Sequence, residues 1–487
     1  MSDIVLATVN AKFQHAAFGL RYLYANLDSL QSRCVLKEWS LGVRERDVVE
    51  QILDYNPKLI GLSVYIWNVD IITRVAALLK SLRPDIKLVI GGPEVSFEWE
   101  EMEIFSHCDY LIRGEADLKF AELAGSLLKG DKPKDKVLAG GLPPLAELSW
   151  PYPHYTDFDL EHGRIVYVEA SRGCPFQCHF CLSSLDKTVR AFDLDRFLAE
   201  MEQLIERGVL KFKFVDRTFN LKAETSRRIL AFFLERYTDG MFLHFEMIPD
   251  RLPDVLRPII SAFPAGVLQF EVGIQSFDPE VCARIGRRQK FDLIEGNLAF
   301  LNEHTGVHVH ADLIAGLPGE NLQSFGRGFD KLHSLGVAEI QVGILKRLRG
   351  TPITLAGEEW EMKYATEAPY EVLRTSVLSF SELQRLNRFA RFWDLVANSG
   401  RFPRLLAELL SGDSAFQEFM KFADCLYEAL GVTAGISAKR LGDSLKSYIV
   451  KLGRISDLEA QSLLDLDRGV PGAAKGLPKR QARHARR

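Results

Sequence analysis

The sequence predicts an α/β protein: a doubly wound parallel-sheet domain, then a partial (β/α)6 TIM-like barrel, then a helical domain. Short apolar runs that suit buried strands alternate with amphipathic helical patterns over residues 1–135 and again over 161–355. Helical periodicity alone dominates residues 356–474. With 487 residues, the chain is long enough for two or three domains with separate cores.

The first domain is predicted from five apolar runs separated by helical patterns. The runs are Ile4–Val9, Val35–Leu41, Leu59–Val64, Lys87–Ile90 and Tyr110–Ile112. Ligands of such sheets bind beyond the carboxyl ends of the strands. Gly91, Gly92 and Gly114 follow two of these runs, where glycine lets backbone approach a ligand closely. A Gly-Gly-Pro sequence is also typical of a plain turn.

Residues 136–160 are rich in proline and glycine and predict an extended linker. Six further strand-like runs then predict the partial barrel, whose chemistry belongs at the carboxyl ends of its strands. These runs are Ile165–Glu169, Phe212–Val215, Phe242–Met247, Leu268–Gly273, Val307–Ile314 and Glu339–Leu345.

Three cysteines follow the first barrel strand with the spacing C-x3-C-x2-C: Cys174, Cys178 and Cys181. Thiolates select zinc or iron–sulfur clusters. A four-iron cluster normally takes four protein ligands, so three cysteines leave one iron open. A zinc site would add a second C-x2-C or two histidines, and only His179 is present, between two of the cysteines. The motif therefore favours an iron–sulfur cluster over a structural zinc knuckle.

Composition indicates a globular protein without a membrane span. Hydrophobic residues make up 47% and charged residues 26%, and the net charge of −4 favours no class of partner. No apolar stretch reaches the ~18 residues of a membrane span, and no signal-peptide pattern opens the sequence. Seven cysteines, three of them clustered, indicate a reducing compartment with metal chemistry. We therefore expect a cytoplasmic protein.

The cysteine motif, with aromatic Phe180 just before its last cysteine, is similar to the cluster motif of radical S-adenosylmethionine (SAM) enzymes. In that family the open iron binds the amino and carboxylate groups of SAM, and an electron from the cluster cleaves SAM to a 5′-deoxyadenosyl radical. The resemblance implies a 4Fe-4S cluster and SAM as cofactors, and an external electron donor of the flavodoxin or ferredoxin type.

The same resemblance implies SAM contacts at the ends of the barrel strands. For a single acidic residue among them, a salt bridge to a nearby lysine or arginine explains its presence equally well. Asp216 stands in the place of the family's Gly-Gly-Glu segment without matching its letters. The implied SAM contacts are Phe180, Asp216, Thr218, Glu246, Glu271, Gln275, Ser276, Gly316 and Leu317.

The first domain, placed before a radical SAM core, resembles a cobalamin-binding domain. The family's Asp-x-His-x-x-Gly motif is absent, because Phe13 stands where the aspartate would be and Gly19 is one residue too far from His15. His15 is therefore expected at the corrin edge or in solvent more than as an axial ligand. A domain that only packs on the core is the alternative. The implied cobalamin contacts are Asn10, Lys12, His15, Ser63, Tyr65, Trp67, Gly91, Gly92, Glu94, Gly114 and Glu115.

The helical domain begins, by its periodicity, with a helix over Val372–Ala397. Such a domain either covers the barrel mouth or only packs against the core. The tail, residues 475–487, has six lysines or arginines and no acidic residue. Such a tail suits RNA or another polyanion, or is simply a solvated end.

Together these parts imply a cobalamin-dependent methyltransferase, in which the radical activates an unreactive carbon or phosphorus centre and methylcobalamin supplies the methyl group. A non-methylating rearrangement, cyclisation or redox step is the first alternative. A non-catalytic cobalamin or cluster sensor, or an RNA-binding protein, is the second. A methylthiotransferase is disfavoured because a second cluster needs three more cysteines in the first domain, where only Cys34 and Cys108 lie. The sequence does not predict whether the substrate is a small molecule, a peptide or something else.

Overall fold

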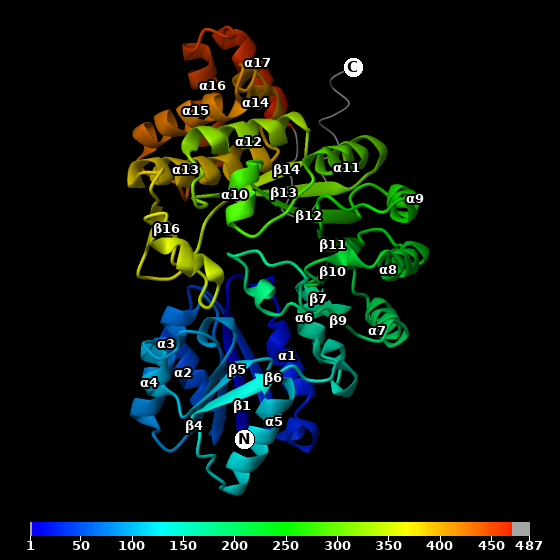
Figure 1. Ribbon diagram of the computed structural model, residues 1–487, viewed down its shortest axis with the longest axis vertical. Helices are drawn as coiled ribbons and strands as arrows, with labels where there is room; N and C mark the ends of the chain where they lie inside the picture. Colours follow the sequence, from blue (N-terminus) through cyan, green and yellow to red (C-terminus); the bar gives the residue numbers. More distant parts are fainter. Residues whose placement is uncertain (1, 470–487) are drawn as a thin grey trace.

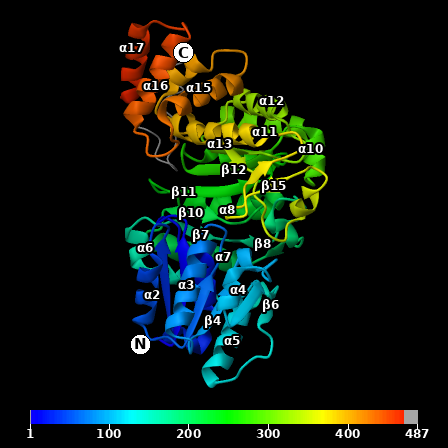
Figure 2. The same cartoon turned by 90° about the vertical axis from the view of Figure 1, so that its left-hand side faces the viewer.

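The computed structural model describes residues 2–469, and the tail 475–487 lies outside them. Three parts follow one another along the long axis of the molecule (Figure 1). The amino-terminal sheet domain occupies one end, the second sheet lies in the middle, and the carboxy-terminal helices occupy the other end. The view turned by 90° shows the same succession (Figure 2).

The first domain is a parallel six-stranded sheet with the strand order β2-β1-β3-β4-β5-β6. Its strands are apolar along most of their length because helices cover both faces, and two separate core clusters fill these layers. The chain passes from β1 to β2 on one side and then crosses to β3 on the other side of β1, which makes β1/β3 the point where strand order switches. The strands are β1 (Ile4–Asn10), β2 (Cys34–Ser40), β3 (Leu59–Ser63), β4 (Lys87–Gly91), β5 (Tyr110–Gly114) and β6 (Val137–Gly141), and the helices are α1 (Phe18–Ala25), α2 (Glu45–Leu53), α3 (Val69–Leu82), α4 (Glu103–His107) and α5 (Asp117–Lys129).

Strand β6 differs from the expected linker, because its residues pair with β5 and extend the sheet by one edge strand. Its side chains are only half-buried, so it lacks the apolar run that marks the other strands. Gly140 is required here, since a Cβ atom at this position would lie 1.9 Å from the Glu115 carbonyl oxygen. The rest of the predicted linker contains the short helix α6 (Asp157–Glu161).

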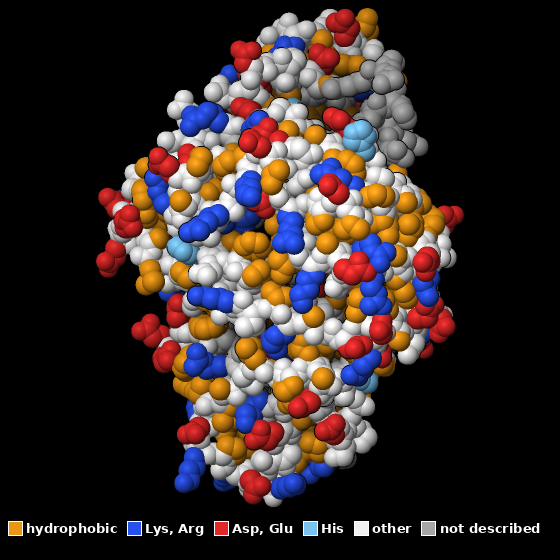
Figure 3. Space-filling model, turned by 45° about the vertical axis from the view of Figure 1, so that its right-hand side comes forward, with side chains coloured by type: hydrophobic (Ala, Val, Ile, Leu, Met, Phe, Trp, Pro, Cys, Tyr) orange, Lys and Arg blue, Asp and Glu red, His pale blue; other side chains and the backbone are white. Residues whose placement is uncertain are grey.

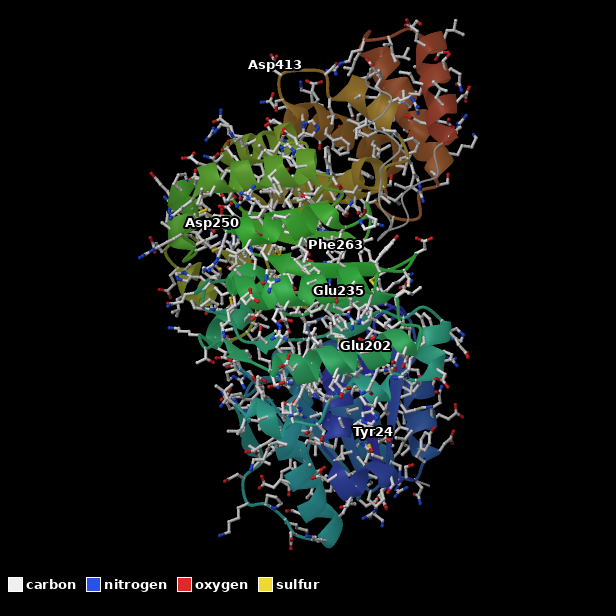
Figure 4. All side chains as sticks on the ribbon, turned by 90° about the vertical axis from the view of Figure 1, so that its right-hand side faces the viewer. Tyr24, Glu202, Glu235, Asp250, Phe263 and Asp413 are labelled. Atoms are coloured by element: carbon white, nitrogen blue, oxygen red, sulfur yellow. The ribbon has the colours of Figure 1, made fainter. Side chains whose placement is uncertain are left out.

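The second sheet has six parallel strands in the order β14-β13-β12-β11-β10-β7, so its two edge strands are not joined and the barrel is partial, as predicted. Asp250 and Phe263 mark opposite ends of this sheet, with Asp250 beyond the carboxyl end of β11 (Figure 4). The strands are β7 (Val166–Val168), β10 (Lys211–Phe214), β11 (Phe242–Met247), β12 (Leu268–Gln275), β13 (His308–Ala315) and β14 (Glu339–Ile344), and the helices are α7 (Leu194–Glu206), α8 (Ala223–Glu235), α9 (Arg257–Ala262), α10 (Pro279–Arg284), α11 (Phe291–His304) and α12 (Leu322–Ser334).

The helical region begins later than the periodicity indicates. Val372–Arg374 forms strand β16, which pairs with β15 (Lys363–Tyr364), and the helix α13 starts only at Phe380, where Ser379 caps it. The predicted helix start at Val372 is therefore wrong, because periodicity over so short a stretch does not distinguish a strand from a helix. The remaining helices are α14 (Pro403–Leu409), α15 (Ala415–Leu430), α16 (Ala438–Lys451) and α17 (Asp457–Arg468).

These carboxy-terminal helices pack on the side of the barrel through α12. Phe329 of α12 makes edge contacts with Phe389 and Trp393 of α13, with ring centroids 5.0 and 4.8 Å apart. A Cβ atom on Gly326 would lie 2.5 Å from the Phe416 ring of α15, so this glycine permits the close approach of the two helices. The helical region and the barrel therefore share one hydrophobic core.

Buried ion pairs join the first domain to the barrel. Arg21 contacts Glu38 and Asp159 at 2.8 Å, and Arg164 contacts the same two carboxylates at 3.0 and 2.7 Å. Removing one member of such a buried set leaves uncompensated charge, which costs about 3–5 kcal/mol. The network therefore fixes how the two sheets are oriented.

Among residues 2–469, no helix is long and apolar enough to cross a membrane. On the face drawn in Figure 3, acidic and basic side chains are interspersed over all three parts. That face carries no continuous patch of one charge of the kind that marks an electrostatic binding surface.

Candidate active site

The loop that carries the three cysteines is closed by a small hairpin. Strand β8 (Ser171–Arg172) pairs with β9 (Arg190–Ala191), and the amide of Cys174 donates a hydrogen bond to the Asp186 carbonyl. Gly173 has a positive φ of 89°, and a Cβ atom there would lie 1.8 Å from the Thr188 carbonyl oxygen. Only glycine fits this crossing, which sets the direction in which the cysteine loop leaves β8.

The far side of the loop is anchored to the barrel. The amide of His179 donates to the Ile285 carbonyl at 2.9 Å, and the His179 carbonyl accepts from the amide of Ile353 at 2.9 Å. Ile285 follows β12 and α10, and Ile353 follows β14, so the loop after edge strand β7 is tied to segments that follow strands in the other half of the sheet. The cysteines are thereby held at the carboxyl ends of the strands, where the sequence places them.

All three cysteines line one cavity of about 190 Å³ at these strand ends. Cys174 and Cys178 are buried, and Cys181 is partly exposed. In the described residues, no three His, Cys, Asp or Glu side chains converge closely enough to bind a single metal ion, which would need ligands at ~2.3 Å. A cubane cluster places each thiolate on a different iron, which suits thiols spread around a larger space.

Arginine balances the charge that thiolates would bring into this cavity. Burial raises the pKa of the Cys178 thiol, and Arg287 opposes that shift by donating a hydrogen bond from Nη1 to Cys178 Sγ at 3.3 Å. The same guanidinium donates to the carbonyl of Gly273 at the end of β12. Arg287 thus connects one of the three cysteines to the strand end, the kind of outer contact that orients a metal ligand.

Five of the nine predicted SAM contacts line the cluster cavity, and four do not. The five are Phe180, Thr218, Glu246, Glu271 and Gln275. Gln275 has a positive φ of 71°, and its Oε1 atom is buried without a hydrogen-bond partner in the described residues. A buried acceptor without a donor is costly unless a ligand satisfies it, so Gln275 fits a ligand-binding role.

The other four predicted contacts are used inside the fold. The Asp216 carboxylate accepts hydrogen bonds from the amide of Ala170 and the hydroxyl of Ser171, so it braces the start of the cysteine loop. Ser276 donates to Glu320 at 2.5 Å. Gly316 and Leu317 pack into the core, where a Cβ atom on Gly316 would meet Val372 at 2.5 Å.

Two acidic residues of the cavity are already paired with bases. Glu271 lies 3.0 Å from His244 Nε2, and although burial opposes it, this hydrogen bond together with the charge of Lys213 lowers the pKa of Glu271 below its usual range. Glu246 forms an ion pair with Arg217 at 2.8 Å. Glu271 is therefore held as a carboxylate on the cavity wall.

A second cavity, of about 380 Å³, lies beyond the carboxyl ends of the first sheet. Helix α1 and the loops after β3, β4 and β5 supply one wall, and residues around β8 supply the other. Six of the eleven predicted cobalamin contacts line it, namely Ser63, Tyr65, Gly91, Gly92, Gly114 and Glu115.

The remaining five predicted cobalamin contacts lie outside the cavity lining. Nδ1 of His15 hydrogen-bonds with the Tyr167 hydroxyl, and Lys12 is exposed. Asn10 donates to Glu38, Trp67 stacks on Tyr65 with ring centroids 4.4 Å apart, and Glu94 pairs with Arg349. His15 is partly exposed and lies in the loop after β1, which pairs with the start of β7, so its place at the corrin edge or in solvent stays a prediction.

Glycines let the segments that border this second cavity pack closely against one another. Gly92 has a φ of 114°, and a Cβ atom there would lie 2.4 Å from the Val64 carbonyl oxygen. A Cβ atom on Gly91 would meet the Ile112 carbonyl oxygen at 3.3 Å. The backbone of both glycines forms part of the cavity wall.

The two cavities share part of a wall. Arg217 and Ser183 line both of them. Arg172, next to the cysteine loop, contacts Glu115 at 2.8 Å and Asp117 at 3.1 Å in the first domain, which holds the two cavities together. A group bound above the first sheet and a group bound at the cysteines would therefore be neighbours.

Sequence reasoning missed the arginines of the site. Arg217 and Arg287 stand in no motif, and neither has a fixed spacing from the cysteines. Only the fold brings α10 and the end of β10 to the same cavity. Arg217 lies directly between two predicted residues, Asp216 and Thr218, in the turn after β10, where no periodic pattern indicates which side chains face the cavity.

Three family models match successive parts of the chain. Residues 4–124 match the B12 binding domain, residues 168–332 match the radical SAM superfamily, and residues 358–486 match a protein family of unknown function, DUF4080. The first two ranges contain the glycine-lined cavity wall and the three cysteines, respectively.

Relatives with curated names match more than half of this chain. An uncharacterized methyltransferase, PH0819 of Pyrococcus horikoshii, is 27% identical over 62% of this chain and 70% of its own length. The cobalamin-dependent radical SAM methyltransferase TokK of Streptomyces tokunonensis is 26% identical over 59% of this chain and 47% of its own length. The solved structure of the radical SAM methyltransferase TsrM from Kitasatospora setae, with cobalamin and a 4Fe-4S cluster bound, is 18% identical and covers 79% of this chain and 82% of its own, with a TM-score of 0.60. That likeness shows a common fold.

Proposed function

Since this chain joins a B12 binding domain to a radical SAM domain and so belongs to the cobalamin-dependent radical SAM proteins, we propose that it is a methyltransferase acting on an unactivated centre. Its cofactors are a 4Fe-4S cluster, SAM and cobalamin. When bound, they supply a carbon-centred radical on one side and a methyl group on the other. The matched methyltransferases support this assignment, although the chain spans only about half of TokK.

The observation that carries the proposal is the wall common to the two cavities, with Arg217 and Ser183 facing both. A substrate held at this wall meets the radical source and the methyl donor in one place. Holding reacting groups in line contributes many orders of magnitude in effective concentration. Two separated cavities would give cleavage of SAM without methyl transfer.

The side chains of this site bind and orient. Cys174, Cys178 and Cys181 hold the cluster, and Arg287 offsets the charge at Cys178. Gln275 offers its buried carbonyl oxygen to a donor on SAM, and Glu271 stays ionised to accept from an ammonium group.

Two features outside the site complete the proposal. Reduction of the cluster needs a small electron-transfer protein of the flavodoxin or ferredoxin type. Within the described residues every cysteine is a free thiol, including buried Cys34 and Cys108, which agrees with action in the cytoplasm.

Anaerobic reconstitution tests the proposal. The protein loaded with iron, sulfide and hydroxocobalamin should retain a cluster absorbance and bound corrin after gel filtration. With SAM, a low-potential reductant and an acceptor-containing extract, it should form S-adenosylhomocysteine together with 5′-deoxyadenosine. Formation of 5′-deoxyadenosine alone would favour the non-methylating alternative, and formation of neither would favour the sensor.

A further inference from the structure

The two edges of the barrel sheet are protected very differently. At β7, the loop after β1 covers the edge: the amide of Ile165 donates to the Gln14 carbonyl at 2.8 Å, and His15 pairs alongside. At β14, other segments of the same protein pair only with the two ends of the strand. An exposed strand edge is a template for another extended chain, and proteins normally hide it.

The amino end of β14 is closed by one side chain. Asn398 donates from Nδ2 to the Ile340 carbonyl at 2.9 Å and accepts from the Ile340 amide at 3.3 Å. Asn398 ends the π-helical turn η9 (Asp394–Asn398), which continues α13. The backbone groups of Ile340 therefore point away from β13, and by the two-residue period of a strand so do those of Val342 and Ile344.

The carboxyl end of β14 is closed by the segment before β16. The amide of Val372 donates to the Leu345 carbonyl at 2.9 Å, and Lys346 bridges to Glu371 in antiparallel register. Between the two closed ends, β13 is the only strand hydrogen-bonded to β14 in the described sheet. The outward amides and carbonyls of Val342 and Ile344 thus lack a strand partner.

A groove of about 490 Å³ lies along this open stretch. Its second wall is α13 (Phe380–Trp393), which runs beside β14 (Figure 1) and contributes Asn387 and Arg391 to the lining. Asp394, the first residue of the turn after α13, also lines the groove and pairs with Arg391 at 3.5 Å. Hydrogen-bonding strand backbone on one wall and amide and charged groups on the other match the alternating donors and acceptors of a polypeptide.

One end of the groove reaches the cluster cavity. Phe180, the residue before Cys181, lines both. A chain lying along β14 in the direction of its carboxyl end is therefore led toward the cysteines. Among the described residues, Phe180 is the one that lines both the groove and the cavity of the cysteines.

We propose that the β14 groove binds an extended peptide segment of the substrate by strand addition, with Val342 and Ile344 exchanging backbone hydrogen bonds with it. The proposal rests on the methyltransferase assignment, and it identifies the substrate as a peptide or protein. Pairing at two outward residues offers up to four backbone hydrogen bonds, and the lining of α13 selects polar side chains.

The test uses anaerobically reconstituted holoprotein and a display library of randomised linear peptides. Val342→Pro removes the outward amide, and proline is tolerated where an edge-strand amide faces away from the sheet. Val342→Thr keeps the backbone and serves as the matched control. We expect the wild type to enrich peptides, Val342→Pro to bind them about tenfold or more weakly, and Val342→Thr to bind them as the wild type does.

A second arm varies the peptide. An enriched peptide that is N-methylated at alternate residues keeps its side chains and loses donors on one edge, so in one of the two registers it should lose binding by about tenfold. Absence of any enriched peptide, or equal binding of the methylated forms in both registers, would overturn the proposal. Cluster absorbance and SAM cleavage are measured in the same preparations. Loss of these two signals in the wild type would count against the methyltransferase assignment, whereas peptide binding reports on the groove alone.

Discussion

The two cavities of this protein differ in part of their walls. The one above the first sheet combines glycine backbone at Gly91 and Gly92 with the ion pair of Arg172 and Glu115, whereas the one at the barrel combines three thiols with the ion pair of Glu246 and Arg217. A wall of backbone selects a ligand by shape, and a wall of donors and charges selects it by chemistry. The difference predicts which substitutions abolish binding and which only weaken it.

The largest effect on cofactor binding is expected from replacing one of the three cysteines. Cys178→Ala should abolish the cluster absorbance and the cleavage of SAM, because two thiolates cannot hold a four-iron cluster with one iron open. Bound cobalamin should be unchanged. Cys425→Ala, which removes a thiol from α15, is the control. If Cys178→Ala keeps its cluster, the ligand assignment is wrong.

A large effect on cobalamin binding is also expected from filling the cavity above the first sheet. Gly19 lies in the first turn of α1, and a Cβ atom there meets only the Tyr65 hydroxyl, at 3.4 Å. Gly19→Leu should weaken cobalamin binding by about tenfold and leave the cluster intact, since overpacking costs about 1–3 kcal/mol. Equilibrium binding of hydroxocobalamin measures this.

Gly125→Leu is the matched control, since a Cβ atom on this helical glycine meets nothing within 4 Å. It should bind cobalamin as the wild type does. Equal weakening by both substitutions would mean that the cavity above the first sheet is not the cobalamin site.

A smaller effect on both sites is expected at their common wall. Arg217→Gln removes the ion pair with Glu246, which is partly exposed and so contributes about 0–1 kcal/mol to stability. SAM affinity and cobalamin retention should each fall about threefold, because the guanidinium faces both cavities. Arg227→Gln, on the outer surface of α8, should change neither. A change at one site alone would contradict a shared wall.

The smallest effect on the two cavities is expected from Glu320, which lies behind them. Burial raises the pKa of Glu320 to about 8, and Ser276 opposes that shift. Because the folded state binds this proton more tightly than the unfolded state, the contribution to stability is present below about pH 4.5 and is lost as the pH rises to about 8.

Glu320→Gln should remove that dependence, which is about 1 kcal/mol per pH unit. Denaturant unfolding of the protein across this pH range measures it. Cofactor binding at neutral pH should be nearly unchanged. An unaltered pH profile in Glu320→Gln would show that Glu320 ionises normally in the folded protein.

Much of the fold could be predicted from sequence because the first sheet is covered on both faces, which makes its strands continuous apolar runs, and because strands of the second sheet alternate between buried and partly buried residues. Strand β6 was not predicted, because half-buried residues and two adjacent glycines are typical of a loop. The short strand at Val372 was not predicted, because three residues are too few to distinguish the period of a strand from that of a helix.

The site was predictable where local spacing carries the chemistry and not where the fold does. The three cysteines lie within one loop, so their spacing can be recognised in the sequence. Arg287 reaches Cys178 only because α10 packs behind the cysteine loop, a contact between residues 109 positions apart. Asp216 has the residue type of a SAM contact, but the choice between facing the cavity and bracing Ser171 is made by backbone direction.

The central claim is that the cluster and cobalamin meet across one wall. Pulsed electron paramagnetic resonance on protein holding the reduced cluster and cob(II)alamin tests it directly. We predict a strong magnetic interaction between the two centres that disappears from the cobalamin spectrum in Cys178→Ala. Full occupancy of both cofactors with no interaction between them would contradict the account.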